Sequence, residues 1–206
     1  MLEIWGRKYS SCVIPVMWAV GELELDHVLH VSGGSFGGLD TPEYGRMKPN
    51  REIPTICDDS LVLWESHAIV RYLAQSYGQG KLWPLNPAER AVSDQWMEWC
   101  KSHAFPAVFP LFLGTVRTEP EKRDMAAIAA KAEEAGKLLR ILDDRLGDIP
   151  LGAVIYRYFN VDVDRPALNN ISAWYDKLCT RPAFQQHVMN FFGTNPQEWL
   201  ELERKS

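Results

Sequence analysis

The sequence contains few cysteines, and they do not form a recognisable spacing. Its four cysteines lie far apart, at Cys12, Cys57, Cys100 and Cys179. Neither the disulfide framework of a small secreted domain nor the paired spacing of a zinc site fits this distribution. We therefore expect no metal site and a reducing, cytoplasmic setting.

Long apolar runs are also absent. No stretch approaches the roughly 20 apolar residues that a membrane-spanning helix needs, and the opening residues MLEIWGRKYS lack the apolar core of a secretory signal. The net charge of −5 argues against nucleic acid or an anionic membrane as the main partner. A chain of 206 residues, 46% hydrophobic and 24% charged, instead suits a soluble globular protein.

The first third of the chain mixes strand and helix patterns. LEIWG and LDHVLHV predict strands, and SCVIPVMWAVGE between them predicts a helix. Pro15 lacks a backbone N–H and therefore belongs in the first helical turn, which places the helix start near Ser11 or Cys12. A helical crossover of this kind is compatible with parallel pairing of the two strands.

A hairpin and a second helix follow. IPTIC and SLVLW flank Asp58-Asp59, which predicts a tight turn between two strands. SHAIVRYLAQSY then predicts a helix, with Ser66 as its N-cap and Gly78 as its C-terminal stop.

The remainder of the chain has helical periodicity only. GQGKLWPLNPAER is broken by glycines and prolines and predicts a linker, and no later segment predicts a strand. The expected fold class is therefore α+β followed by all-α. We expect an α/β domain over 1–80, a linker over 81–89 and a helical domain over 90–206.

Ile53-Pro54 and Glu65-Ser66 together describe a slot for a short peptide. A cis bond before Pro54 would leave the backbone of Ile53 free to pair with an extended peptide, whereas a trans proline at a strand edge is the ordinary alternative. The unpaired N–H groups at the start of the next helix can bind a carboxylate, although Ser66 can equally be a simple N-cap. Glu65 can pair with an amine.

These motifs resemble the glutathione-binding half of cytosolic glutathione transferases. Ile53-Pro54 before the hairpin and ESHAI, from Glu65 to Ile69, match the family pattern without gaps. WGRKYSSCVIPVMWAVGELEL resembles the opening of bacterial, theta-like members. The resemblance covers most of the chain and implies a thioredoxin-like domain followed by a helical-bundle domain.

The resemblance also assigns the slot. It implies a cis bond at Pro54, pairing of the glutathione cysteinyl backbone with Ile53, and contact of the γ-glutamyl group with Glu65 and Ser66. Arg51 matches a position that faces the glycyl carboxylate, a task that suits a cation; its alternative is a solvated surface arginine. Reduced glutathione is then a co-substrate, and no permanently bound cofactor is implied.

The start of the first helix must stabilise the glutathione thiolate, because the thiolate is the nucleophile. Ser10 aligns with the activating serine or threonine of theta-like classes, so its hydroxyl is the first candidate to donate to the sulfur. Ser11 is the neighbouring candidate, and either serine can merely cap the helix. Tyr9 is a further donor type, which the alignment disfavours.

Cys12 supports a different hypothesis. A cysteine at a helix N-terminus is expected to have a lowered pKa and to form a mixed disulfide with glutathione, which is reductase chemistry. Such a glutathione-dependent thiol–disulfide reductase would use either Cys12 or the bound glutathione. An inert, buried Cys12 is the alternative. A non-catalytic glutathione-binding or interaction protein is the third possibility, since a fold does not fix a function.

The remaining expectations concern the second substrate and partners. Phe105, Phe109 and Phe112 either line a pocket for a small apolar electrophile or belong to the core. Conjugation of glutathione to such an electrophile is the expected activity, in a detoxification role. The resemblance implies a homodimer, and neither nucleic acid nor a membrane is an expected partner.

One segment departs from the family pattern. The connection from Leu146 to Asp148 is shorter than in relatives, and Arg145 stands where a capping serine or threonine is usual. Either this connection is truncated or residues are missing from the sequence. A true deletion bears on the stability of the helical domain more than on the glutathione slot.

Overall fold

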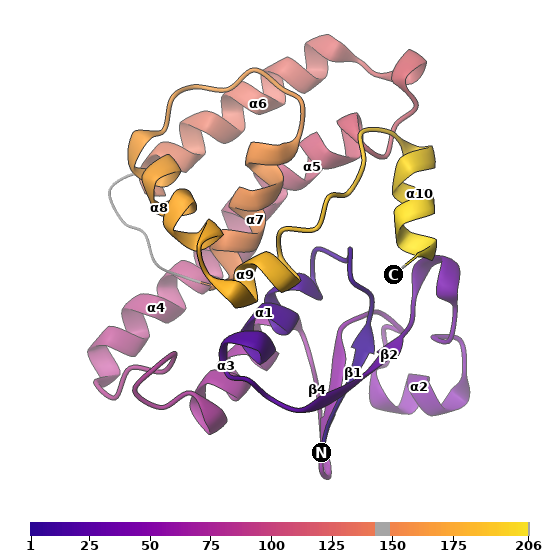
Figure 1. Ribbon diagram of the computed structural model, residues 1–206, viewed down its shortest axis with the longest axis vertical. Helices are drawn as coiled ribbons and strands as arrows, with labels where there is room; N and C mark the ends of the chain where they lie inside the picture. The colour runs from indigo at the N-terminus through magenta and orange to yellow at the C-terminus, as the bar shows by residue number, and fades with distance from the viewer. Residues whose placement is uncertain (143–148, 206) are drawn as a thin grey trace.

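A computed structural model describes residues 1–142 and 149–205, and its chain folds into a small mixed sheet beside a larger group of helices (Figure 1). The expected short connection from Leu146 to Asp148 lies outside these residues. The elements of the first part are β1 (Leu2–Gly6), α1 (Ile14–Glu22), β2 (His27–Val31), α2 (Pro42–Met47), β3 (Thr55–Asp58), β4 (Leu61–Trp64) and α3 (Ser66–Tyr77).

The sheet has the strand order β2-β1-β3-β4. β1 pairs in parallel with β2 and antiparallel with β3, and β4 completes the hairpin with β3. Ile4 lies opposite Leu29 on one side and Ile56 on the other, and both isoleucines are fully buried. The predicted strands and their parallel crossover are therefore confirmed.

Two helix starts differ from the prediction. α1 begins at Ile14 rather than near Ser11 or Cys12, because residues 11–13 form a turn in which the N–H groups of Val13 and Ile14 both donate to the carbonyl of Ser10. Pro15 still lies in the first turn. α3 begins at Ser66 itself, and its N-cap is Glu65.

The rest of the described chain is helical, as predicted. Its elements are α4 (Pro87–Trp99), a π-helical turn (Cys100–Ala104), α5 (Phe105–Thr115), α6 (Met125–Leu139), α7 (Ile149–Asn160), α8 (Asn169–Cys179), α9 (Pro182–His187) and α10 (Pro196–Arg204). α4 begins within the range expected for the linker, and the boundaries 1–80, 81–89 and 90–206 stay a prediction.

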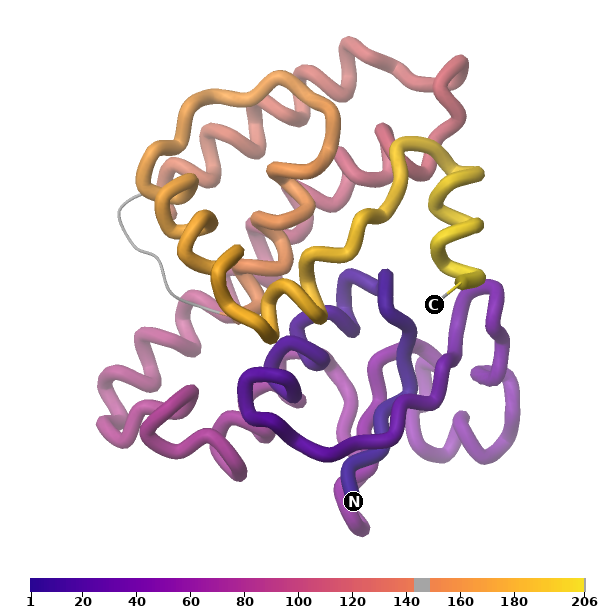
Figure 2. Tube along the Cα trace, in the orientation of Figure 1, coloured from indigo at the N-terminus to yellow at the C-terminus, as the bar shows by residue number. Residues whose placement is uncertain are grey.

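The C-terminal helix returns to the sheet side of the molecule. The trace in Figure 2 runs from α9 across the front of the helical group to α10. There Glu203 of α10 forms an ion pair with Arg7, which follows β1. The end of the chain thus contacts the loop that leads into α1.

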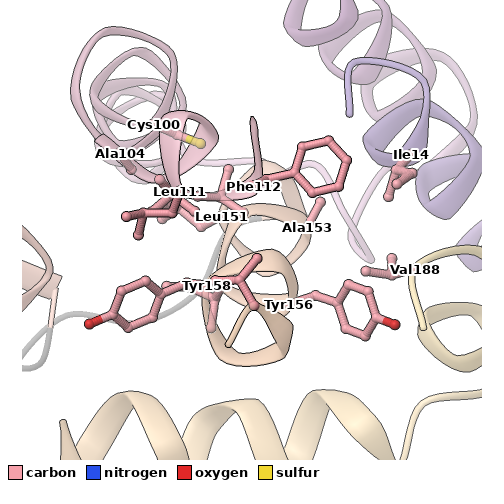
Figure 3. Close-up of a cluster of buried hydrophobic side chains, with 14 of the residues drawn as sticks. Ile14, Cys100, Ala104, Leu111, Phe112, Leu151, Ala153, Tyr156, Tyr158 and Val188 are labelled. Atoms are coloured by element: carbon pink, nitrogen blue, oxygen red, sulfur yellow. The ribbon is translucent and has the colours of Figure 1, made fainter. Parts of the chain in front are cut away.

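α1 joins the two parts through the larger of two apolar cores. Its Ile14 and Trp18 belong to the core of the helical part, together with Ala153 and Val188 (Figure 3). Gly152 of α7 permits this contact, because a Cβ there would lie 2.6 Å from the Trp18 ring. The start of α1 is therefore held against α7, and this contact shapes the site described next.

Candidate active site

The segment before β3 is held in place by hydrogen bonds from Tyr44 of α2. The Tyr44 hydroxyl donates to the carbonyl of Glu52 at 2.7 Å and lies 2.9 Å from Oγ1 of Thr55. Ile53-Pro54 between them is a cis peptide bond, as the resemblance implied. Within the described residues, the N–H and C=O of Ile53 make no hydrogen bond. These two groups are the ones expected to pair with a peptide.

Arg51 is tied into the neighbouring loop. Its Nη1 donates to the carbonyls of Leu39 and Thr41, each at 3.0 Å. Arg51 is therefore a surface arginine whose side chain is fixed by hydrogen bonds, and it is not freely solvated. Its backbone lies in the left-handed region, with φ of 53°. The remaining N–H groups of the guanidinium are the ones that can meet a carboxylate.

Glu65 and Ser66 occupy the junction between β4 and α3. The expected N-cap role of Ser66 is wrong, because Glu65 takes the capping position with φ 70° and ψ 113° and makes no side-chain cap. Such a backbone costs about 1–3 kcal/mol for a residue other than glycine, and residues of this kind cluster at functional sites. Ser66 instead lies in the first turn of α3, among N–H groups that the helix leaves unpaired.

Two lysines hold the Glu65 carboxylate. Lys101, in the π-helical turn, donates to Oε2 at 3.0 Å, and Nζ of Lys48 lies 3.9 Å from Oε1. The hydrogen bond from Lys101 lowers the pKa of Glu65 and outweighs the opposing effect of burial. Glu65 is thus an ionised hydrogen-bond acceptor, and its cationic partner Lys101 comes from the helical part of the chain.

Of the two serines before α1, Ser11 lines a cavity and Ser10 does not. Ser11 and Cys12 line it, while Ser10 is half-buried beside it and accepts two backbone hydrogen bonds through its carbonyl. The Tyr9 ring is buried, with its centroid 5.7 Å from that of Trp199, and it does not line the cavity. Of these four candidates, the structure therefore places Ser11 and Cys12 in the cavity wall, and neither Ser10 nor Tyr9.

The expected lowered pKa of Cys12 is wrong. Although the residue is exposed as a whole, burial of its thiol against the cavity wall raises the pKa, and the Glu65 carboxylate adds to this. Cys12 precedes α1 instead of standing in its first turn. A thiol with a raised pKa is a poor nucleophile at neutral pH, which disfavours a reductase that uses Cys12 but does not bear on one that uses bound glutathione.

The cavity has a volume of about 240 Å³ and lies between the two parts of the chain. Its apolar wall comes from α1, α5 and α7, and includes Phe105 and Phe109, whose rings stack at 4.9 Å. Phe112 is instead buried in the core. Two of the three predicted aromatics therefore face the cavity. The full lining is Ser11, Cys12, Ile14, Pro15, Glu65, Ser66, His67, Cys100, Lys101, Phe105, Val108, Phe109, Pro150, Ala153, Val154 and Arg157.

Three polar residues of the wall carried no functional assignment in the sequence: His67, Lys101 and Arg157. Burial lowers the pKa of His67 to about 4, so its imidazole is neutral at neutral pH. Lys101 reaches Glu65 from 36 residues away, and Arg157 reaches the carbonyl of Tyr9 from 148 residues away. A motif in a continuous stretch of sequence could not reveal either contact.

The described residues show neither a metal-binding cluster nor a membrane-spanning helix. Among them, no group of three His, Cys, Asp or Glu side chains is arranged to hold a metal ion. No helix in residues 1–142 or 149–205 is both long and apolar enough to cross a bilayer.

Comparison with known proteins gives consistent matches. Residues 9–76 match the family model for the glutathione S-transferase N-terminal domain. The chain is 39% identical over 204 residues to the glutathione S-transferase GstB of Escherichia coli strain K12, covering 92% of this chain and 98% of that relative. It is 28% identical to glutathione S-transferase F13 of Arabidopsis thaliana, covering 89% and 93%.

Solved structures agree with the sequence matches. The theta class glutathione S-transferase from the citrus canker pathogen Xanthomonas axonopodis pv. citri, with glutathione bound, superposes with a TM-score of 0.87 at 42% identity. The match covers 93% of this chain and 99% of that one. Its apo form superposes with a TM-score of 0.79.

Proposed function

The chain belongs to the glutathione S-transferase family, and on this premise we propose how it binds glutathione and activates the sulfur. The fold is the family's thioredoxin-like domain followed by a helical domain, and the activity is that of a glutathione transferase. Glutathione enters as a co-substrate that leaves with each product. The proposal concerns the residues that carry these steps.

Glutathione lies along the edge formed by residues 51–54 and the start of α3. Its cysteinyl backbone pairs with the N–H and C=O of Ile53, beside Pro54, because these groups have no partner in the described chain. Its γ-glutamyl carboxylate takes the N–H groups and hydroxyl at Ser66, and its ammonium group meets Glu65. Arg51 faces the glycyl carboxylate with the N–H groups that the loop does not use.

The sulfur lies at the start of α1. There the Ser10 hydroxyl donates a hydrogen bond to it, and Ser11 and Cys12 form the adjacent wall. A free thiol with a pKa of about 8.5 is only a few per cent ionised at pH 7, so a donor at this position increases the reactive thiolate. The thiol proton passes to solvent, and the thiolate attacks an electrophilic carbon to form the new S–C bond, with loss of the leaving group where there is one.

The cavity wall supports a small apolar electrophile as the second substrate. The observation that supports this substrate class is the position of Phe105 and Phe109. Both face the same cavity as Ser11, Cys12 and Glu65. Aromatic and aliphatic surface binds an apolar molecule, and the polar groups opposite hold glutathione against it. The two substrates are therefore held side by side.

A panel assay with matched variants tests this function. The wild type is assayed with glutathione and halonitroarenes, enones and alkyl halides, and Ser10→Ala and Ser11→Ala are compared. We expect Ser10→Ala to lower kcat/KM about 100-fold with little change in KM for glutathione. Glutathione binding without rate acceleration for any electrophile would contradict the proposal and favour a binding protein.

The chain is further proposed to form a homodimer. The edge strand β4 exposes Leu61, Val62 and Trp64, each about two-fifths exposed, and apolar edges of this kind are normally covered. Light scattering of the purified protein tests this, with Val62→Glu as the disrupting variant. A monomeric wild type contradicts it.

We also assign the enzyme to the cytoplasm and to detoxification. Reduced glutathione and the wide spacing of the four cysteines along the sequence both suit a reducing compartment. Cell fractionation tests the location, and sensitivity of a deletion strain to the electrophiles found in the panel tests the role.

A further inference from the structure

Arg157 of α7 carries a charge that is almost completely buried. The residue is 3% exposed, and its guanidinium carbon lies 4.2 Å from the ring centroid of Phe112 and 5.1 Å from that of Phe192. Aromatic faces attract a cation, yet they do not neutralise it. The arginine is therefore held firmly in an apolar setting at the wall of the cavity.

The hydrogen bonds of this guanidinium are incomplete. Nη2 donates to the carbonyl of Tyr9 at 2.8 Å, whereas Nη1 is buried and has no partner. Among the described residues, no carboxylate lies within ion-pair distance of Arg157. A buried charge without a counter-charge is costly to a folded protein, so a retained one points to an anion that arrives from outside.

The charged and titratable groups around Arg157 indicate where in the cavity such an anion would bind. The groups that act on its guanidinium are Tyr156, Cys12, Arg117 and Arg7. Two of these are cations, and of the two only Arg7 has an acidic partner in the described chain, Glu203. The Cys12 thiol at the start of α1 is in turn acted on by Glu65, Lys48, Glu52 and Arg157 itself. Positive charge thus accumulates behind the start of α1.

We propose that the fixed positive charge of Arg157 stabilises the glutathione thiolate from the helical side of the cavity. The inference depends on the position assigned to the sulfur under the proposed function. The guanidinium keeps its proton throughout, and the thiol proton passes to solvent. Nη1 is buried, so the charge acts on S⁻ through space, while Nη2 holds the Tyr9 carbonyl and thereby the loop that carries Ser10.

The test follows the ultraviolet absorbance of the thiolate in the glutathione complex as a function of pH. Wild type, Arg157→Gln and Arg157→Lys are compared; the glutamine keeps a donor for Tyr9 without the charge, and the lysine keeps the charge. We expect Arg157→Gln to raise the pKa of the bound thiol by about one unit and Arg157→Lys to restore most of the shift. Below that pKa, kcat/KM falls about tenfold for every electrophile in Arg157→Gln, because the rate follows the thiolate fraction.

Arg165→Gln is the matched control. Arg165 also caps backbone carbonyls at the end of α7, with Nη1 donating to Phe159 at 2.7 Å, but it does not line the cavity. It is expected to leave the bound thiol pKa unchanged. If Arg157→Gln does not fold, as judged by its thermal transition, Arg157→Met supplies an apolar substitute of similar length.

Each outcome decides between the two claims. A depressed thiol pKa in the wild type that persists in Arg157→Gln overturns the role of Arg157 and leaves the proposed function standing. An ordinary thiol pKa in the wild type contradicts both. Loss of activity confined to anionic electrophiles, with the thiol pKa unchanged, would make Arg157 a substrate-binding residue and would also overturn the proposal.

Discussion

Lys101 and Glu65 form an ion pair across the cavity, with Nζ 3.0 Å from Oε2. Lys101 belongs to the helical part of the chain, and Glu65 ends the hairpin of the sheet. Lys101 therefore stands where the ammonium group of glutathione is proposed to bind.

Lys101→Met is expected to raise the pH at which glutathione binding is lost on acidification. The hydrogen bond from Lys101 is the main cause of the lowered pKa of Glu65, so its removal raises that pKa. Glu65 must be ionised to hold the ammonium group. Binding in the variant should therefore be lost at a higher pH than in the wild type as the solution is acidified, as measured by calorimetric titration. An identical acid limit would contradict the account.

Glu65→Gln is expected to weaken glutathione binding at neutral pH. The amide cannot neutralise the substrate ammonium group, and a loss of about tenfold in affinity follows from removal of one partly exposed charge pair. Glu133→Gln is the control, because Glu133 pairs with Lys137 on an exposed face of α6. Equal effects from both substitutions would point to a non-specific cause.

His67 is expected to make the protein less stable below neutral pH. Burial lowers its pKa to about 4 from 6.5, so the unfolded state takes up the proton first. The stabilising contribution is complete above pH 6.5 and is lost as the pH falls toward 4, by up to about 3 kcal/mol. Denaturant titrations of wild type and His67→Gln measure this difference.

The control for His67 is His103→Gln, at an exposed histidine of the π-helical turn. It should leave the pH dependence as in the wild type. A wild-type stability that is level between pH 6.5 and 4 would show that His67 is not desolvated as described.

Arg181→Met is expected to destabilise the contact between α1 and α9. Burial raises the pKa of Glu22, but the hydrogen bonds from Arg181 and Trp18 outweigh it, and the pKa is lowered. Arg181 donates to both oxygens, at 2.7 and 2.5 Å, and without it Glu22 would be a poorly paired buried charge. A loss of about 2 kcal/mol is expected, because Arg181 itself is half exposed. Thermal unfolding measures it, with Lys137→Met as a control that changes little.

The strands and the helix order followed from local signals in the sequence, and the peptide slot is a prediction from signals of the same kind. Alternation predicted β2, and the Asp58-Asp59 turn predicted the hairpin of β3 and β4. The motifs at Ile53-Pro54 and Glu65-Ser66 indicate the proposed slot because each is a continuous stretch of sequence. The capping position at α3 did not follow, since a serine before an apolar run is normally the N-cap. Here the backbone of Glu65 takes a left-handed turn and moves the helix start by one residue.

The wall of the cavity could not be predicted in the same way. Lys101 and Arg157 contact residues that lie 36 and 148 positions away in the sequence. Each is a single basic residue outside any sequence motif, so neither contact could be predicted. Phe105, Phe109 and Phe112 recur at helical spacing, so only the packing of α5 shows that Phe112 faces the core while the other two face the cavity.

The pKa of the thiol in bound glutathione is the measurement that tests the central claim most directly. The complex is titrated with pH while the thiolate absorbance is followed, first in the wild type and then in Ser10→Ala. The account predicts a value well below the free value of about 8.5 in the wild type, and a rise toward it in Ser10→Ala. A wild-type value equal to that of free glutathione would contradict a site built to ionise the sulfur.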